Sequence, residues 1–204
     1  MPQSIIPPAY RQIRAVYDDE TITVYQAYNS EIAIPAVAQQ SLTASPAFQL
    51  DRMTWVKPSF MWMMYRSGYS YKEPRQAHIL AIKITRQSFE ALLRQSSVKE
   101  GRALTSEEKS NSVRIQWDPE RSIRIEKLPY RSIQIGIGSK ICSQYLSGIV
   151  EIQDITETAR KLKSLLDEEK DEDAKLLLPT EKVYPLPEEL RSSLKMDVVD
   201  ECLV

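Results

Sequence analysis

The chain has 204 residues, of which 42% are hydrophobic and 27% are charged, so we expect one soluble globular domain. Only five glycines occur, and the phosphate-binding patterns G-x-G-x-x-G and G-x-x-x-x-G-K-[ST] are absent, which argues against nucleotide sites of those classes. The formal net charge of −1 hides an asymmetry, because residues 1–150 hold 19 Lys and Arg against 13 Asp and Glu, whereas residues 151–204 hold 8 against 15. The basic body suits either a polyanionic partner or a solvated surface.

The two cysteines, Cys142 and Cys202, form no metal-binding or disulfide pattern. The N-terminus lacks the apolar run of a secretory signal, and no segment reaches the roughly 18 apolar residues of a membrane span. We therefore expect a cytoplasmic protein that uses no membrane, metal or cofactor. The lone His78 has no His or Cys companion in the sequence, so it is a poor candidate for a metal ligand or a catalytic triad.

Hydrophobic periodicity predicts an α+β domain with a mixed, mostly antiparallel sheet and flanking helices. In chain order we expect two short strands around a turn in 13–28, a helix over 29–42 capped by Asn29 or Ser30, and a helix opened by Lys57-Pro58 and ended by Gly68. We then expect a strand over 78–84, a helix over 86–96 capped by Thr85, and a polar loop to about Asn111. The remaining elements are two strands around the sequence WDPER, a short segment over 139–148, a strand over 149–155, and a helix over 157–169 capped by Thr156. Residues 1–170 would form a single catalytic domain, and residues 171–204 an acidic, proline-punctuated tail.

Three carboxylates follow the first predicted strand. Asp18, Asp19 and Glu20 lie close to Arg14 in the sequence and can bind a divalent metal, hold a guanidinium group or solvate a turn. Further along, Tyr25 and Tyr28 flank a strand-to-helix junction in the sequence YQAY. These two tyrosines either pack in the core with satisfied hydroxyls or line a pocket.

A second group surrounds the predicted start of the helix after Pro58. Arg52 and Lys57 flank Trp55, and Arg66 follows inside the helix. The free amides of a helix start attract phosphate or carboxylate, so this group predicts a phosphate or tRNA contact with Trp55 stacking on a base. The competing interpretation is that the aromatic residues belong to the core.

The third group is the sequence WDPER. Asp118 and the following proline are typical of a turn, which would end the strand at Trp117 and present Glu120 at the end of a sheet. An indole beside a carboxylate can raise its pKa toward the range of a general base. Arg121 can instead pair with Glu120 as an exposed ion pair, and Gln134 on the next strand is expected nearby.

These motifs carry a resemblance to a known family. The stretches IRAVYDDETITVYQAYNSEIA, RMTWVKPSFMWMMYRSG, VRIQWDPER and RSIQIGI together resemble a domain family long catalogued as of unknown function, whose fungal members include the arginine-containing cyclodipeptide synthases. The resemblance covers roughly residues 10–165. It implies that two aminoacyl-tRNAs, one of them arginyl-tRNA, are condensed to a diketopiperazine without ATP, because the aminoacyl ester is already activated.

The resemblance also implies a catalytic glutamate in a motif of two aspartates, two variable residues and a glutamate. This chain lacks that spacing and has instead Asp18-Asp19-Glu20 and Asp118-Pro119-Glu120. We therefore expect Glu120 to be the catalytic carboxylate, helped by Asp118, with Glu20 as the next candidate. The other acidic cluster would bind the arginine guanidinium.

Two other functions remain open from the sequence. The order of an early strand with Arg14, a middle aromatic pair and Glu120 at a strand end loosely resembles the ADP-ribosyltransferase fold, which uses NAD. A non-catalytic RNA-binding module also suits the basic body. Bound NAD would favour the former, and bound tRNA without product the latter.

Overall fold

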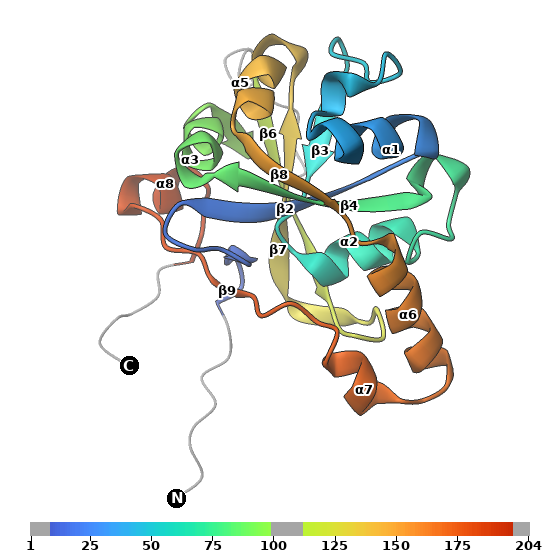
Figure 1. Ribbon diagram of the computed structural model, residues 1–204. Helices are drawn as coiled ribbons and strands as arrows, with labels where there is room; N and C mark the ends of the chain where they lie inside the picture. The colour runs from blue at the N-terminus through green and yellow to red at the C-terminus, as the bar shows by residue number, and fades with distance from the viewer. Residues whose placement is uncertain (1–8, 99–111, 198–204) are drawn as a thin grey trace, which may run out of the picture.

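Two β-sheets form the framework of the protein in the computed structural model, which describes residues 9–98 and 112–197 (Figure 1). The first sheet is antiparallel, with strand order β2-β4-β8. The second has order β3-β7-β6-β5 and is antiparallel except for the parallel pair of β5 and β6. The strands are β2 Thr21–Tyr28, β3 Thr54–Val56, β4 His78–Thr85, β5 Ser96–Val98, β6 Val113–Arg121, β7 Lys127–Ile137 and β8 Ile149–Asp154. The predicted α+β class with mostly antiparallel sheets is confirmed.

Within the described residues, the backbones of Tyr25 and Lys57 join the two sheets. The amide of Tyr25 in β2 donates to the carbonyl of Lys57 at 2.7 Å, and the amide of Lys57 donates back to Tyr25 at 3.2 Å. Beyond this pair, β2 and β3 separate. The separation opens space between the sheets on the side where Gln26 and Trp55 lie.

Alternation along β6 and β7 gives the second sheet one apolar and one polar face. Ile115 and Trp117 of β6 pair with Ile135 and Ile133 of β7, and all four side chains are buried in the core. Since side chains alternate between the faces of a sheet, the intervening residues point to the opposite side. Those residues are Gln116 and Asp118 on β6 and Ser132, Gln134 and Gly136 on β7.

The helices up to residue 167 lie in the predicted segments, with differences at their starts, whereas α7 and α8 lie in the segment expected to be a tail. They are α1 Ser30–Gln39, α2 Phe60–Ser67, α3 Arg86–Arg94, α5 Cys142–Ser147, α6 Thr156–Asp167, α7 Asp171–Lys175 and α8 Glu188–Ser193, with short 3-10 turns η1 Leu42–Ala44, η2 Pro74–Gln76 and η3 Ser139–Ile141. Asn29 caps α1 and Thr85 caps α3 as predicted. Helix α2 begins after Pro58 rather than with it, because the Ser59 hydroxyl accepts the amide of Trp62.

The start of α6 also differs from the prediction. Thr156 was expected to cap the helix, but it is the first helical residue and Ile155 occupies the cap position. The carboxylate of Asp154 accepts the amide of Thr156 at 2.8 Å, so the side chain that satisfies the helix start comes from the end of β8.

The turn predicted at Asp118-Pro119 is wrong, because β6 continues through both residues to Arg121. Strand β5 pairs only with the beginning of β6, so at Pro119 the strand has β7 on one side, and the missing amide of proline is tolerated there. A register irregularity lies between Pro119 and Arg121, and the chain reverses only at Ser122–Glu126.

The C-terminal segment up to residue 197 packs on the domain. Strand β9 (Lys182–Val183) pairs with β1 (Arg14–Ala15), and Tyr184, Leu190 and Leu194 are buried in the main core. The segment expected to be a tail therefore contributes structure as far as it is described. The predicted polar loop to Asn111 lies mostly outside the described residues, as does Cys202.

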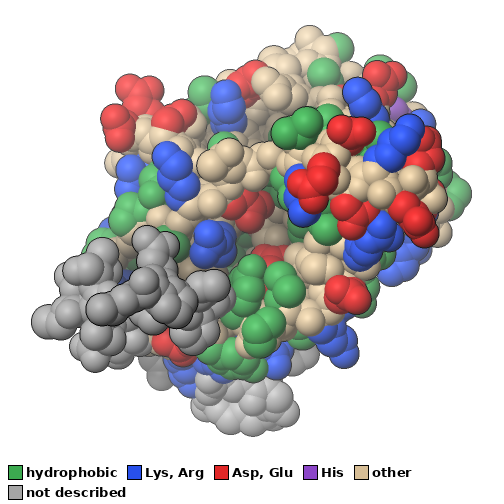
Figure 2. Space-filling view, turned by 90° about the horizontal axis from the view of Figure 1, so that it is seen from below, with side chains coloured by type: hydrophobic (Ala, Val, Ile, Leu, Met, Phe, Trp, Pro, Cys, Tyr) green, Lys and Arg blue, Asp and Glu red, His purple; other side chains and the backbone are tan. Residues whose placement is uncertain are grey.

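The acidic charge of the C-terminal part is partly neutralised by close ion pairs. Lys163 pairs with Asp167 and Lys175 with Glu172, while Arg124 from the β6–β7 turn pairs with Asp171. Figure 2 shows acidic and basic side chains interspersed over the face seen from below. Among the described residues, no helix combines the length and apolar character needed to cross a membrane.

Candidate functional site

A polar cavity of about 440 Å³ lies where β2 and β3 separate. Its wall includes four glutamines from four different elements, two aromatic residues and two basic residues. These are Gln26 and Tyr28 of β2, Trp55 of β3, Lys57, Arg66 of α2, Gln76 of η2, Gln116 of β6 and Gln134 of β7. The volume falls within the range of small-molecule sites in proteins.

The amide groups of the cavity are held by hydrogen bonds. The Gln26 side chain donates to the Thr54 hydroxyl at 2.7 Å and to the Trp55 carbonyl at 3.1 Å, and its oxygen accepts the buried hydroxyl of Tyr145 at 2.8 Å. The Gln134 amide donates to the Gln116 oxygen at 3.0 Å. Such fixed donors and acceptors are suited to orienting polar groups of a ligand.

Lys57 is the buried amine of this cavity. Its side chain comes from the residue that joins the two sheets, and only 5% of the residue is exposed. Burial lowers the pKa of Lys57 to about 7, and the positive charge of Arg66 lowers it further, while Asp118 opposes the shift. The ammonium lies 4.9 Å from the centre of the Trp62 ring. An amine with this pKa is partly neutral at physiological pH and can accept a proton.

Asp118 stands next to the cavity on the polar face of β6. Burial raises the pKa of its carboxyl group, and the charges of Lys57 and Arg131 oppose that rise. Its Oδ2 atom lies 3.4 Å from the side-chain nitrogen of Gln134. The structure thus brings Asp118, Gln134 and Lys57 together, and the expected proximity of Gln134 to the WDPER segment is confirmed.

Glu120 lies beneath the start of α2 and is 5% exposed. Its Oε1 atom accepts the Ser59 hydroxyl at 2.9 Å and the Arg121 amide at 2.8 Å. Burial raises its pKa, while the hydrogen bonds from Arg121 and Ser59 oppose the rise. The raised pKa matches the expectation for this carboxylate, but its cause is burial under α2, since Trp117 points into the core and donates its indole N–H to the Leu194 carbonyl.

A second carboxylate fills the start of α2. Glu181 accepts the backbone amide of Phe60 at 2.7 Å, and Ser59 accepts that of Trp62 at 3.1 Å. The expectation of free amides that bind an external anion is therefore wrong at these two positions. Burial and then the charge of Glu120 raise the pKa of Glu181 to about 8, while Arg14 lowers it. The helix start is therefore already occupied by a carboxyl group of the same chain.

The acidic turn stands at the opposite end of β2 from the cavity. Asp18 Oδ1 accepts the amides of Glu20 at 2.9 Å and Thr21 at 2.7 Å, and these bonds lower the pKa of Asp18. Asp19 and Glu20 are exposed. The turn-forming interpretation thus accounts for this cluster. Within the described residues, no group of three or more His, Cys, Asp or Glu side chains is arranged to hold a metal ion.

The two tyrosines of β2 lie on opposite sides of the strand. Tyr28 lines the cavity, and its hydroxyl lies 3.3 Å from that of Thr54. Tyr25 packs edge-to-face against Phe60 at 5.6 Å on the other side. Burial raises the pKa of both hydroxyls well above the ordinary value. Tyr28 therefore matches the pocket interpretation, whereas Tyr25 is a buried core residue that also lines a separate pocket of about 260 Å³.

Residues 12–184 match the family described as Domain of unknown function (DUF4291). The chain belongs to this family. No curated protein matches it. The matched range contains every residue of the polar cavity described above, and it extends to Glu181 and Tyr184 in the C-terminal segment.

The remaining predicted site residues lie at the edge of the polar cavity or apart from it. Arg52 lines a neighbouring groove and donates to Gln49 at 3.2 Å. The Arg121 guanidinium stacks on Tyr65 at 3.6 Å, and the Trp55 ring lies across Gly136. Arg14 is near enough to both Glu120 and Glu181 to lower the pKa of each.

Sequence reasoning found Gln134 but missed the other three glutamines of the cavity, Glu181 and the surroundings of His78. Alternation offered a signal for Gln116, because the strand residues between the apolar positions of β6 are all polar. Glu181 lies 61 residues after Glu120 and gives no local signal. His78, judged a poor triad member, contacts Asp154 and Ser30 from distant segments.

Proposed function

We propose that this DUF4291 protein is an aminoacyl-tRNA-dependent transferase that condenses arginyl-tRNA with a second aminoacyl-tRNA to an arginine-containing diketopiperazine. The resemblance of the four sequence stretches described above supports this reaction class. The observation that supports it most directly is the cavity itself, which is lined both by Lys57, whose pKa burial lowers to about 7, and by glutamine side chains held by hydrogen bonds.

The reaction needs a base. The α-ammonium group of one aminoacyl ester must lose a proton before its nitrogen can attack the carbonyl of the other ester, and the tRNA hydroxyl that leaves must gain one. A base works best when its pKa is close to the working pH. Neutral Lys57 can accept the ammonium proton and return it to the leaving hydroxyl. A second attack of the same kind closes the ring.

Asp118 is the proposed partner of the arginine side chain. A carboxylate can bind a guanidinium group through two parallel hydrogen bonds. Asp118 lies beside the cavity, where Gln134 at 3.4 Å fixes its orientation. The glutamines would bind the amine and carbonyl groups of the two aminoacyl moieties. This arrangement replaces the acidic turn at Asp18 as the proposed guanidinium site.

Glu120 remains the alternative base. Its raised pKa suits proton transfer, but it is buried beneath Ser59 and α2 and does not line the cavity. Lys57→Met and Glu120→Gln separate the two roles, because each keeps the approximate shape and removes the titratable group. Loss of the true base should slow turnover by roughly 10²–10⁴ with folding intact. The other variant should retain most of the activity.

The tRNA would approach over the basic rim. Arg66 lines the cavity, and Arg52 and Arg75 line the adjoining groove. Each phosphate contact contributes a slope of roughly −0.7 to −0.9 to the salt dependence of binding. Arg52→Gln should therefore weaken tRNA binding and flatten its salt dependence. Since charged tRNAs are cytoplasmic, the proposal places the protein in the cytoplasm.

The decisive experiment is mass spectrometry of extracts from a host that expresses the full chain. We expect a cyclic dipeptide that contains arginine, which disappears with Lys57→Met and persists with Glu189→Gln, an exposed control in α8. Soluble protein without any such product would contradict the proposal. Binding of charged tRNA without product would indicate an RNA-binding module, and binding of NAD an ADP-ribosyltransferase.

A further inference from the structure

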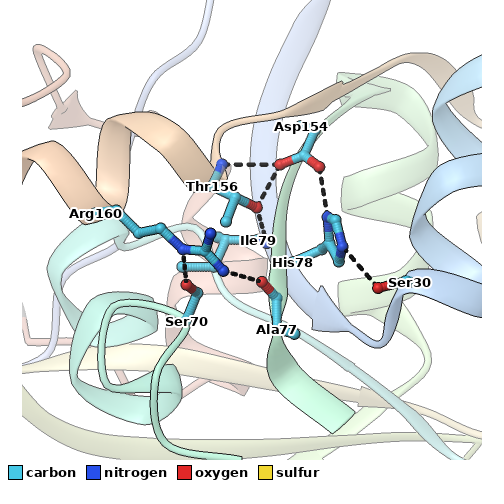
Figure 3. Close-up of polar contacts among 8 residues, drawn as sticks. All are labelled: Ser30, Ser70, Ala77, His78, Ile79, Asp154, Thr156 and Arg160. Atoms are coloured by element: carbon cyan, nitrogen blue, oxygen red, sulfur yellow. Dashed lines mark hydrogen bonds and ion pairs between the residues drawn. The ribbon is translucent and has the colours of Figure 1, made fainter. Parts of the chain in front are cut away.

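Three side chains at one end of the first sheet form a continuous hydrogen-bonded chain (Figure 3). Asp154 Oδ2 lies 2.7 Å from His78 Nδ1, and His78 Nε2 lies 3.0 Å from the hydroxyl of Ser30. His78 begins β4, Asp154 ends β8 and Ser30 begins α1, so segments far apart in the sequence supply the three groups.

The order of these contacts defines the path of a proton. A carboxylate only accepts hydrogen bonds, so His78 must donate through Nδ1–H to Asp154. In the tautomer that carries this proton on Nδ1, the lone pair of Nε2 faces the Ser30 hydroxyl and can take its proton. Partial burial raises the pKa of Asp154, but hydrogen bonds from Thr156 and His78 outweigh it and hold the pKa below the ordinary value. Asp154 thus stays ionised and orients the imidazole.

The surrounding structure holds Asp154 and His78 in place. The other oxygen of Asp154 accepts the amide of Thr156 and also contacts the Thr156 hydroxyl. That hydroxyl accepts the amide of Ile79, the residue after His78, at 2.9 Å. Figure 3 also shows Arg160 of α6, which donates to Ser70 at 2.8 Å. The start of α6 and the start of β4 are therefore tied together at this point.

Ser30 combines accessibility with nearby backbone donors. Its side chain is exposed at the first position of α1, where the amides of Ser30 and Glu31 have no carbonyl of a preceding turn to accept them. Asn29 satisfies the amide of Ile32, two positions further along. Amides beside a nucleophilic serine can stabilise the negative oxygen of a tetrahedral intermediate.

A groove of about 230 Å³ is lined by residues close in the sequence to this group. Asn29, the residue before Ser30, and Ile32 of α1 line one part of it, and Arg75, three residues before His78, lines another part. Tyr28 and Phe48 contribute aromatic surface. The groove offers a mixed apolar and basic surface for the acyl or alcohol part of an ester.

We propose that Ser30, His78 and Asp154 form a nucleophilic acyl-transfer centre that accepts the acyl group of a carboxylic ester. Ser30 Oγ attacks the ester carbonyl while its proton passes to His78 Nε2. The bond from the carbonyl carbon to the alcohol oxygen then breaks, and the leaving alkoxide takes that proton from His78. The product is an acyl ester of Ser30, which water or an amine releases by the same steps in reverse order.

The competing explanation is a structural one, in which His78 and Asp154 are an ion pair at the sheet end and Ser30 is an ordinary helix residue. A structural pair would leave Ser30 no more reactive than any other exposed serine. The two explanations therefore differ in the chemical reactivity of Ser30. A test with a simple ester does not depend on the proposed tRNA reaction, because such an ester contains no nucleotide.

The test is incubation of the full chain with p-nitrophenyl acetate, followed by release of p-nitrophenol and peptide mass spectrometry. We expect an acetyl group on Ser30. Ser30→Ala should abolish this adduct, and Ser192→Ala, an exposed serine of α8, should not affect it. His78→Gln and Asp154→Asn should slow acetylation by at least about 10²-fold.

Asp154→Asn retains an oxygen that can accept the Thr156 amide, so circular dichroism should show an unchanged fold. Three results would overturn the proposal. They are no acetyl group on Ser30 in the parent protein, an equal rate of p-nitrophenol release by Ser30→Ala, or an unchanged Ser30 acetylation rate in a folded His78→Gln variant.

Discussion

Among single residues, Lys57 links the proposed chemistry to stability, because the lowered pKa that suits a base also makes stability depend on pH. Burial lowers its pKa to about 7, whereas the unfolded chain keeps it at the ordinary value of 10.5. Between these values the unfolded chain holds a proton that the folded protein lacks. Stability therefore rises with pH across this window, by at most about 1.4 kcal/mol per pH unit.

Lys57→Met should remove this dependence, because methionine keeps an apolar stem without the amine. We expect the variant to be more stable than the parent near about pH 7, and the difference to shrink toward about pH 10. Urea unfolding at several pH values measures it. Lys83→Met is the matched control, since Lys83 is 42% exposed and its pair with Glu151 raises its pKa. A pH-independent difference for Lys57→Met would refute the lowered pKa.

At the scale of elements, Glu181 couples the C-terminal segment to the start of α2. Its folded pKa of about 8 lies above the ordinary 4.5, so between these values the folded protein holds a proton that the unfolded chain lacks. Its contribution to stability is therefore lost as pH rises through this window. Glu181→Gln keeps an oxygen for the Phe60 amide and removes the titration.

We expect Glu181→Gln to match the parent near about pH 4 and to exceed it in stability near about pH 8, as measured by chemical unfolding. Glu189→Gln, at an exposed position, serves as the control. Equal pH profiles for Glu181→Gln and the parent would show that Glu181 titrates normally and would remove the argument for a buried carboxyl at this helix start.

The approach of β3 to β7 requires a glycine. A Cβ atom at Gly136 would lie 2.8 Å from the Trp55 ring and 2.9 Å from the Met53 sulfur. Gly136→Ala should therefore destabilise the protein by about 1–3 kcal/mol and displace Trp55 from the cavity wall. Thermal unfolding measures the loss, and Trp55→Leu combined with Gly136→Ala should recover part of it. Additive losses in the double variant would mean that the indole is not the obstacle.

These elements also show what the sequence could predict. Local signals placed the helices well, because Asn29 and Thr85 cap them through contacts within three residues. The turn at Asp118-Pro119 was wrong, since the short pairing of β5 with β6, which leaves room for Pro119, depends on residues far away. The cavity depends on the backbone pairing of Tyr25 with Lys57, where β2 meets the residue after β3. These two residues are far apart in the sequence, so no local pattern predicts that they pair.

For the molecule as a whole, the C-terminal segment completes the hydrophobic core. Tyr184 is buried between Tyr17 and Phe89, at 5.2 and 5.3 Å between ring centres, and its hydroxyl binds Arg86 and Glu90. Leu194 lies above Trp117, whose indole donates to its carbonyl at 3.0 Å. The segment thus covers apolar surface that the sheets and α3 leave open.

The chain after about residue 170 was expected to be a tail, but its contacts with the core lead us to expect that the fold depends on it. Truncation after Lys170 removes β9, Glu181, Tyr184 and the core leucines in and after α8, so we expect the product to lose cooperative unfolding. Leu194→Ala tests the same contact without truncation and should cost about 2–5 kcal/mol. Leu176→Ala is the control, since Leu176 is 83% exposed and should change stability by less than about 0.5 kcal/mol. A truncated chain that unfolds cooperatively at the parent's midpoint would show that the first 170 residues fold without the segment.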